Sequence, residues 1–225
     1  MNTLNYIKGL NEAQKQAVLH TEGPLLIVAG AGAGKTKTLT HRIAHLIASG
    51  VQGNAILAVT FTNKAAGEMR ERVEKLLGDV HLGGRYPYLS TFHSLGVRLL
   101  REFSAEAELS RSFTIWDRDD STRALKRILG SLGLDAYTPR QILSRISREK
   151  SDGVTVREFA ERVERPYDRA VATAWEAYEK RLASEDALDF DDLLVKTLML
   201  LRKSEIAAKL TERWHYIHID EYQDT

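Results

Sequence analysis

The order of apolar and polar residues along this chain alternates between two patterns, which predict strands and helices in turn. Residues 25–29 are apolar without interruption, as in a strand that is buried on both faces. Apolar positions then recur at helical spacing through residues 37–49. The same succession follows at 55–61 and 64–77, and again at 88–90 and 95–103, and a last apolar run occupies 216–219. This order predicts an α/β protein, with a parallel sheet flanked by helices.

A different pattern occupies residues 113–183, where helical spacing recurs without a strand of comparable strength. Three helices are expected there, around 124–129, 142–146 and 171–182, with Pro139 and Pro166 near the starts of two of them. The segment therefore predicts an all-helical insertion. From residue 111 to residue 150 there are nine Lys or Arg against five Asp or Glu. Such a face could contact a phosphate backbone, although a solvated helix surface explains it nearly as well.

The segment between the first expected strand and its helix is typical of a phosphate-binding loop. Its glycines let successive backbone N–H groups converge on an anion at a helix N-terminus. Lys35 is expected to reach the β- and γ-phosphates, and the Thr36 hydroxyl to bind magnesium. The usual pattern begins with Gly where this chain has Ala29, and a flexible linker is the alternative reading. The candidate nucleotide-binding residues here are Ala29, Gly30, Ala31, Gly32, Ala33, Gly34, Lys35, Thr36 and Lys37.

Two carboxylates follow the last expected strand, at Asp220 and Glu221. Asp220 can hold a magnesium ion, largely through its water ligands, and Glu221 can orient and deprotonate an attacking water. Such carboxylates can also be mere surface charge. Together with the phosphate loop they favour hydrolysis of a nucleoside triphosphate over phosphoryl transfer to another substrate.

Polar side chains elsewhere are candidates for contacts with a base or a nucleic-acid strand. Gln14, on a short helix that Asn11 caps, offers a donor and an acceptor to adenine. Two turns rich in aromatic and hydroxyl groups follow expected strands, where a parallel sheet meets its ligands. Alternatively, Phe61 is a core residue, Asn63 a helix cap and His93 a structural histidine. The candidate DNA-binding residues are Phe61, Thr62, Asn63, Lys64, Thr91, Phe92 and His93.

Composition narrows the class of protein without identifying a function. A hydrophobic content of 43% suits a folded chain, and the formal net charge of +1 gives no global attraction to nucleic acid. The absence of cysteine excludes disulfides and thiolate metal sites. There is no apolar run of membrane-spanning length and no basic-then-apolar start like that of a secretion signal. We therefore expect a cytoplasmic protein.

Six blocks in order give the chain a resemblance to superfamily 1 DNA helicases of the UvrD, PcrA and Rep type. They are LNEAQ at 10–14, AGAGAGKT at 29–36, AVTFTNKAAGEM at 58–69, STFHS at 90–94, ALDFDDLL at 187–194 and IDEYQDT at 219–225. The resemblance implies a RecA-like ATPase domain at 1–112 plus 184–225 and a helical insertion domain at 113–183. It implies ATP and magnesium as cofactors, and adenine recognition by Gln14. It also implies catalytic roles for Lys35, Glu221 and Gln223, the last sensing the γ-phosphate or coupling it to DNA.

The same resemblance implies DNA partners and a larger enzyme. Its members act on single-stranded DNA, or on duplex with a 3′ single-stranded tail, and move 3′ to 5′ in processes such as DNA repair. They also carry a second RecA-like domain, which we expect to be missing from this chain, and its arginines typically contribute about 10³-fold or more to turnover. We therefore expect the chain to be weakly active or inactive by itself. A non-catalytic module that binds nucleotide and single-stranded DNA or a partner protein is the alternative, and a kinase is disfavoured because no acceptor lid follows Glu221.

Overall fold

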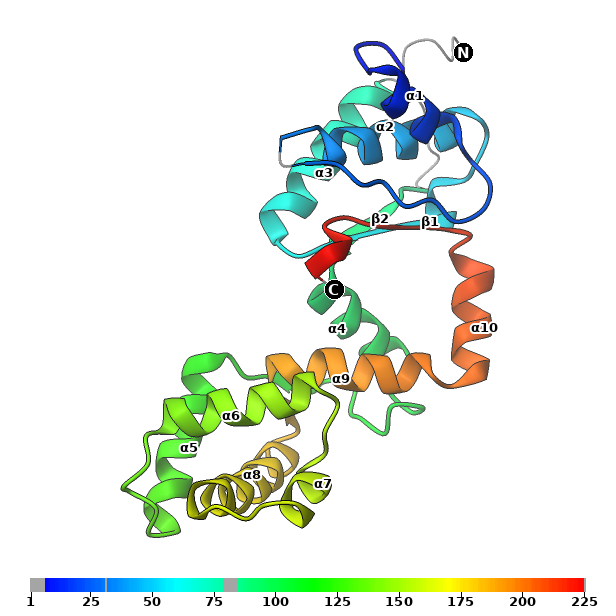
Figure 1. Cartoon of the computed structure of the whole chain (residues 1–225). Helices are drawn as coiled ribbons and strands as arrows, with labels where there is room; N and C mark the ends of the chain where they lie inside the picture. Colours follow the sequence, from blue (N-terminus) through cyan, green and yellow to red (C-terminus); the bar gives the residue numbers. More distant parts are fainter. Residues whose placement is uncertain (1–6, 31, 79–84, 225) are drawn as a thin grey trace. The chain divides into compact units, whose positions relative to one another are not determined.

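A computed structural model describes residues 7–30, 32–78 and 85–224 of the chain. The described residues divide into two compact units. One unit contains the residues up to Leu95 together with those from Ala207 onwards, and the other contains Gly96–Ile206. Figure 1 shows the elements of each unit in the colours of the sequence. Each unit is described by itself.

The first unit is built on a parallel sheet whose order among the described residues is β2-β1-β5. Its strands are β1 (Ile56–Thr60), β2 (Tyr88–Thr91) and β5 (Tyr216–Ile219). In β1 all five residues are buried, as the unbroken apolar run predicts for a central strand with two covered faces. The expected parallel α/β architecture is therefore confirmed.

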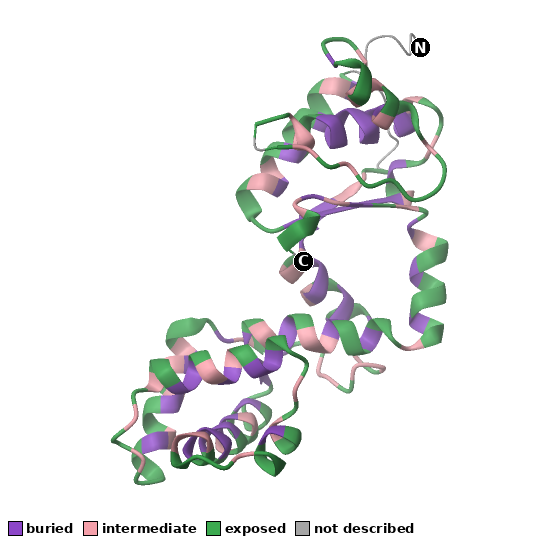
Figure 2. Cartoon of the chain, viewed as in Figure 1, coloured by how far each residue is buried: buried purple, intermediate pink, exposed green. Residues whose placement is uncertain are grey.

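Helices α1 (Glu12–Leu19), α2 (Lys35–Ala48) and α3 (Asn63–Leu77) belong to this unit, and α4 (Phe92–Glu102) follows β2 directly. Apolar side chains of α2 pack with β1 and α3 into a common core, and Figure 2 shows most of α2 as buried. The helical spacing predicted these apolar positions correctly, because their residues are all buried: Leu39, Ile43, Leu46 and Ile47.

Residues 25–29 do not form the buried strand that their apolar run predicts. They belong to neither sheet, and the side chains of Leu26 and Val28 are 69% and 87% exposed. An apolar run becomes a buried strand only where ladder partners and covering elements meet it. Among the described residues β5 is the edge strand opposite β2, and its Ile217 is exposed as well. Hydrophobicity alone does not specify which strand an apolar segment pairs with.

The second unit is mostly helical. Its helices are α5 (Arg118–Ser131), α6 (Pro139–Ser151), α7 (Val156–Glu161), α8 (Pro166–Ser184) and α9 (Phe190–Leu201), and α10 (Ser204–Arg213) leads out of it. A two-stranded parallel ladder joins β3 (Thr114–Ile115) to β4 (Ala187–Leu188). A core of apolar side chains from α5, α6 and α8 surrounds Trp175 and Tyr178.

Three of these helices match the expected ones at 124–129, 142–146 and 171–182, and Pro139 and Pro166 each open a helix. Helices α7 and α10 were not predicted, and α7 is only six residues long. The proposed division at residues 113–183 stays a prediction. None of the helices among the described residues is long and apolar enough to cross a membrane.

Candidate functional site

The ends of three strands lie at one edge of the sheet. Thr60 of β1 is level with Thr91 of β2, and Val59 pairs with Ile219 of β5. The Asp220 backbone N–H then donates to the Val59 carbonyl at 2.9 Å. The residues that follow β1, β2 and β5 therefore share the carboxyl edge, where open parallel sheets bind ligands. In Figure 1 these strands lie side by side.

The phosphate-loop sequence leads into the N-terminus of α2. Gly34 is its N-cap in the left-handed conformation, with φ of 83° and no side-chain cap. The backbone N–H groups of the first turn are thus left for an anion, as the expected cradle requires. The Lys35 ammonium donates to the Ala29 carbonyl at 3.2 Å, so the side chain folds back along the loop. Ala31, one of the candidate residues, lies outside the described residues.

Thr36 and Asp220 are brought together from positions 184 residues apart in the sequence. The Thr36 hydroxyl donates to Asp220 Oδ2 at 3.2 Å. Burial raises the pKa of Asp220, and so does the charge of Glu221, whereas the hydrogen bonds from Thr36 and from the Glu221 N–H and the charge of Lys35 oppose the rise. A buried carboxylate with too little positive charge around it is suited to a cation.

The Thr36 hydroxyl and the Asp220 carboxylate offer a magnesium ion two oxygen ligands. These are fewer than the ion needs, as is usual for magnesium sites in proteins. Magnesium prefers oxygen ligands and keeps several waters, and it is often held by one or two protein groups plus phosphates. Within the described ranges, no group of three or more His, Cys, Asp or Glu could hold a metal. A metal at Thr36 and Asp220 would therefore depend on nucleotide and water for its other ligands.

Glu221 lies directly beside this pair, in a strained backbone conformation with φ of 52°. Its N–H donates to Asp220 Oδ1 at 3.2 Å. The Gln223 amide donates to Glu221 Oε2 at 2.5 Å, at the start of a short 3₁₀ helix (Tyr222–Asp224). Asp220, Glu221 and Gln223 are thus coupled by contacts that the sequence pattern did not reveal.

Gln14 reaches the phosphate loop from α1. Its side-chain oxygen accepts from the Asn11 N–H at 3.0 Å in a capping box, as the expected cap at Asn11 requires. Its amide nitrogen donates to the Ala33 carbonyl at 3.0 Å. Lys37 is drawn away from the loop, because its ammonium donates to the Gly9 carbonyl at 2.7 Å. Gln14 therefore contacts the phosphate loop, whereas Lys37 binds another part of the chain.

The two aromatic turns lie against each other. The rings of Phe61 and Phe92 are 5.2 Å apart between centroids and tilted by 56°. Phe61 is 41% exposed, unlike a core residue. Thr62, rather than Asn63, caps α3 by accepting from the Ala65 N–H at 3.1 Å. Asn63 and Lys64 are exposed in the first turn.

The second turn is internally braced. The Thr91 hydroxyl donates to Ser94 Oγ at 2.9 Å and accepts from the Ser94 N–H at 3.1 Å. His93, between them, is half-buried and makes contacts of its own. The Thr91 hydroxyl is therefore already hydrogen-bonded within the turn. Phe61 and Phe92 are the side chains of these turns best placed for stacking.

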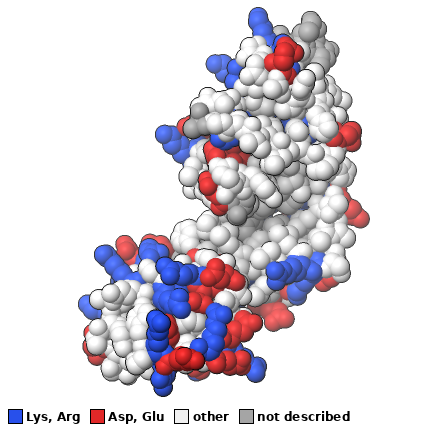
Figure 3. Space-filling view, in the orientation of Figure 1, with Lys and Arg blue, Asp and Glu red and all other residues white. Residues whose placement is uncertain are grey.

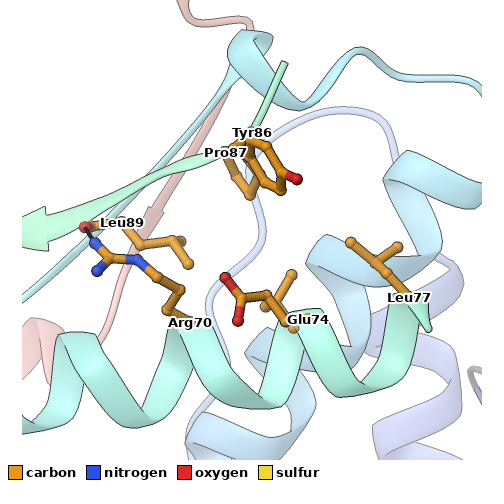
Figure 4. A pocket seen from close by; sticks show the side chains of 7 residues that line it. Arg70, Glu74, Leu77, Tyr86, Pro87 and Leu89 are labelled. Atoms are coloured by element: carbon orange, nitrogen blue, oxygen red, sulfur yellow. Dashed lines mark hydrogen bonds between the residues drawn. The ribbon is translucent and has the colours of Figure 1, made fainter. Parts of the chain in front are cut away.

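A separate hollow of about 200 Å³ lies between α3 and the start of β2. Figure 4 shows Arg70 and Glu74 on its α3 side and Tyr86 and Pro87 opposite. Arg70 donates to the Leu89 carbonyl at 3.0 Å. None of the candidate nucleotide or DNA residues lines this hollow.

The fold and the strand-end residues define a parallel α/β protein with a phosphate-loop sequence at the carboxyl edge of its sheet. The family described as UvrD/REP helicase N-terminal domain matches residues 10–225, and the chain belongs to this family. The resemblance to UvrD, PcrA and Rep helicases is thereby confirmed.

Named relatives are similar over almost the whole chain. The ATP-dependent DNA helicase PcrA of Leuconostoc citreum is 44% identical over 230 residues, which cover 100% of this chain and 30% of the relative. UvrD1 of Mycobacterium tuberculosis H37Rv is 46% identical, covering 97% and 29% respectively. PcrA of Bacillus subtilis is 44% identical, covering 99% and 31%. The chain thus spans about 30% of the length of the relatives that it matches.

Proposed function

We propose that this chain is the ATP-binding and DNA-contacting part of an ATP-dependent DNA helicase or translocase. Its relatives are named as ATP-dependent DNA helicases. The observation that carries the proposal is the hydrogen bond between Thr36 and Asp220, which joins the phosphate loop to the acidic strand end. A flexible linker or a surface carboxylate would have no reason to make this contact.

The positions of the side chains support the following roles. Lys35 turns from the Ala29 carbonyl to the β- and γ-phosphates, and the first N–H groups of α2 hold the anion. Thr36 and Asp220 would hold magnesium, which would neutralise developing charge on the phosphates when bound. Glu221 accepts a proton from the attacking water, and Gln223, already hydrogen-bonded to Glu221, senses the γ-phosphate.

Single-stranded DNA is the second ligand. Phe61 and Phe92 present adjoining rings on which bases can stack, and Asn63 and Lys64 supply exposed polar groups for the backbone. On the face that Figure 3 shows, the Lys and Arg side chains of the second unit alternate with Asp and Glu. This face therefore forms no continuous basic surface. The adjoining rings and the exposed polar groups beside them favour a DNA site on the turns of the first unit. A RecA-like first domain, 3′ to 5′ movement and a second RecA-like domain as partner belong to the same proposal.

Nucleotide binding by the 225-residue chain tests the proposal directly. A fluorescent ATP analogue is titrated with and without magnesium, for the native chain and for Lys35→Ala. We expect magnesium-dependent binding that weakens at least about tenfold in the variant, since a charge-assisted contact is worth about 1.5–3 kcal/mol. Lys15→Ala is the matched control, because Lys15 is ion-paired with Glu12 on the same helix.

A measurement of ATP hydrolysis distinguishes a helicase motor from a non-catalytic binding module. Lys35→Ala is compared with the native sequence in a protein extended to the length of the relatives. DNA-stimulated hydrolysis that disappears in the variant supports the motor. Hydrolysis that survives the substitution contradicts it.

A further inference from the structure

The helical unit contains a buried group of charged side chains that the proposed function does not use. Lys150, in the last turn of α6, has a side chain that is only 5% exposed. Its ammonium lies 3.0 Å from Asp189 Oδ2, 2.8 Å from Asp192 Oδ1 and 2.9 Å from Glu179 Oε1. We call these four residues the Lys150 cluster. It joins α6 to α8 and to the start of α9.

The cluster holds more negative than positive charge. One ammonium faces three carboxylates, which gives a net charge of −2 when all of them are ionised. Burial lowers the pKa of Lys150, but the three carboxylates outweigh burial and leave that pKa raised, so the lysine stays charged. Any reduction of this excess negative charge must therefore come from protonation of a carboxylate.

Hydrogen bonds distinguish the three carboxylates. Asp189 accepts from Lys150, from the Tyr178 hydroxyl at 3.2 Å and from the Asp192 N–H at 2.8 Å. Glu179 accepts from Lys150 and from the Trp175 ring N–H, and its side chain is 34% exposed to water. These contacts stabilise both anions.

Asp192 is the least supported of the three. It accepts from Lys150 and from the Asp189 N–H at 3.2 Å, and its side chain is only 8% exposed. It therefore has neither the third donor of Asp189 nor the water contact of Glu179. A buried anion that has neither a third donor nor contact with water is well placed to take up a proton.

The remaining groups around the cluster do not restore the balance. Tyr178 is kept in its neutral, donating form because burial and Asp189 raise its pKa. Asp191, next in the same turn, interacts with Ser147 and Arg118 as well as with the cluster, and burial raises its pKa. Of these side chains only Arg118 is a further cation, and it is also hydrogen-bonded to Ser144.

We propose that the helical unit binds a proton at Asp192 in mildly acidic solution and is stabilised by doing so. Burial, with Asp189 and Glu179, raises the pKa of Asp192 to about 6 against the opposing effect of Lys150. A raised pKa in the folded state means that the stabilisation is full below the ordinary Asp range. It is lost as the pH rises through about 6. Most paired carboxylates have the opposite effect on stability.

Carboxyl carbon NMR of the 225-residue chain tests the proposal. The Asp192 signal, identified by its loss in Asp192→Asn, is expected to titrate near pH 6. Glu179→Gln keeps the acceptor for Trp175 and removes one negative neighbour, so it should move this midpoint to lower pH. Asp152→Asn, an exposed carboxylate beyond the end of α6, should leave it unchanged.

Urea unfolding followed at resonances of the helical unit gives a second readout. Between about pH 7 and about pH 5 the native midpoint should rise relative to that of Asp192→Asn. An Asp192 midpoint near the ordinary Asp value, or equal pH slopes in the two proteins, would overturn the proposal. Both measurements are independent of nucleotide and DNA, so their failure would leave the helicase proposal untouched.

Discussion

The Thr36 hydroxyl donates a hydrogen bond to Asp220 at 3.2 Å, which holds the start of α2 against the end of β5. Thr36→Val keeps the shape of the side chain and removes this donor and the proposed metal ligand. Magnesium-dependent binding of ATP should weaken about tenfold or more, since hydrogen bonds to charged groups are worth about 1.5–3 kcal/mol. Titration with a fluorescent ATP analogue measures the loss. Thr36→Ser should retain most of the affinity, and equal losses in both variants would contradict the role of the hydroxyl.

Gly34 is required by the backbone at the start of α2. A Cβ at this position would lie 3.0 Å from the Gln14 amide nitrogen, in a conformation with φ of 83°. Gly34→Ala should therefore destabilise the first unit by about 1–2 kcal/mol, the cost of a left-handed non-glycine residue. Thermal unfolding measures this change. Gly67→Ala in α3 has open space around its Cβ and should be neutral or stabilising by up to about 1 kcal/mol.

Phe61 is expected to contribute a stacking contact with single-stranded DNA. Phe61→Ala should weaken binding of an oligonucleotide by about 1–3 kcal/mol, the usual value for one stacked base. Fluorescence anisotropy measures the affinity. Tyr86 is a suitable control because it is 60% exposed but lies at the separate hollow beside α3. If Tyr86→Ala and Phe61→Ala have the same effect, the loss is not specific to the proposed DNA site.

Gly96 allows α4 and α9 to approach closely within the helical unit. A Cβ here would lie 2.8 Å from Thr197 Oγ1 and 3.0 Å from the Leu193 carbonyl oxygen. Gly96→Ala should cost about 1–3 kcal/mol of stability, as overpacking usually does. Gly130→Ala in α5 meets nothing closer than 3.6 Å, so it should instead stabilise slightly. Urea unfolding of the two variants should move in opposite directions.

Lys150 is the only cation in direct contact with its three carboxylates among the residues that the structure describes. Lys150→Met leaves these anions without a partner, and breaking a buried ion pair in this way costs about 3–5 kcal/mol. Chemical unfolding of the helical unit measures the loss. Lys126→Met removes an exposed lysine of α5 and should change stability by less than about 0.5 kcal/mol. A small effect of Lys150→Met would show that the cluster contributes little to the fold.

Local patterns were sufficient to predict most of the first unit. The apolar spacing of α2 and α3, the apolar run of β1 and the cap at Asn11 are properties of short segments, and each has the predicted structure. The run at 25–29 has a similar composition to β1 but lies outside the sheet. The difference arises from neighbouring strands, which a single segment does not encode.

The Lys150 cluster shows the other limit of prediction. Asp189 and Asp192 form a capping box at the start of α9, and they also bind a buried lysine. One signal was present in the sequence, because Lys150 follows Ile146 at the spacing that places both on the buried face of α6. The partners lie 39 and 42 residues away, and only the packing of α6 against α9 brings them together.

The hydrogen bond from Arg70 to the Leu89 carbonyl affects how readily another chain can pair with β2. Among the described residues β2 is a border strand, with a partner strand on one side only. Unpaired carbonyls on such a strand invite another chain to add to the sheet. Arg70 occupies one of these acceptors and places a charged group over the border. The same contact that shapes the hollow beside α3 therefore removes one of the acceptors through which another chain could pair with this strand.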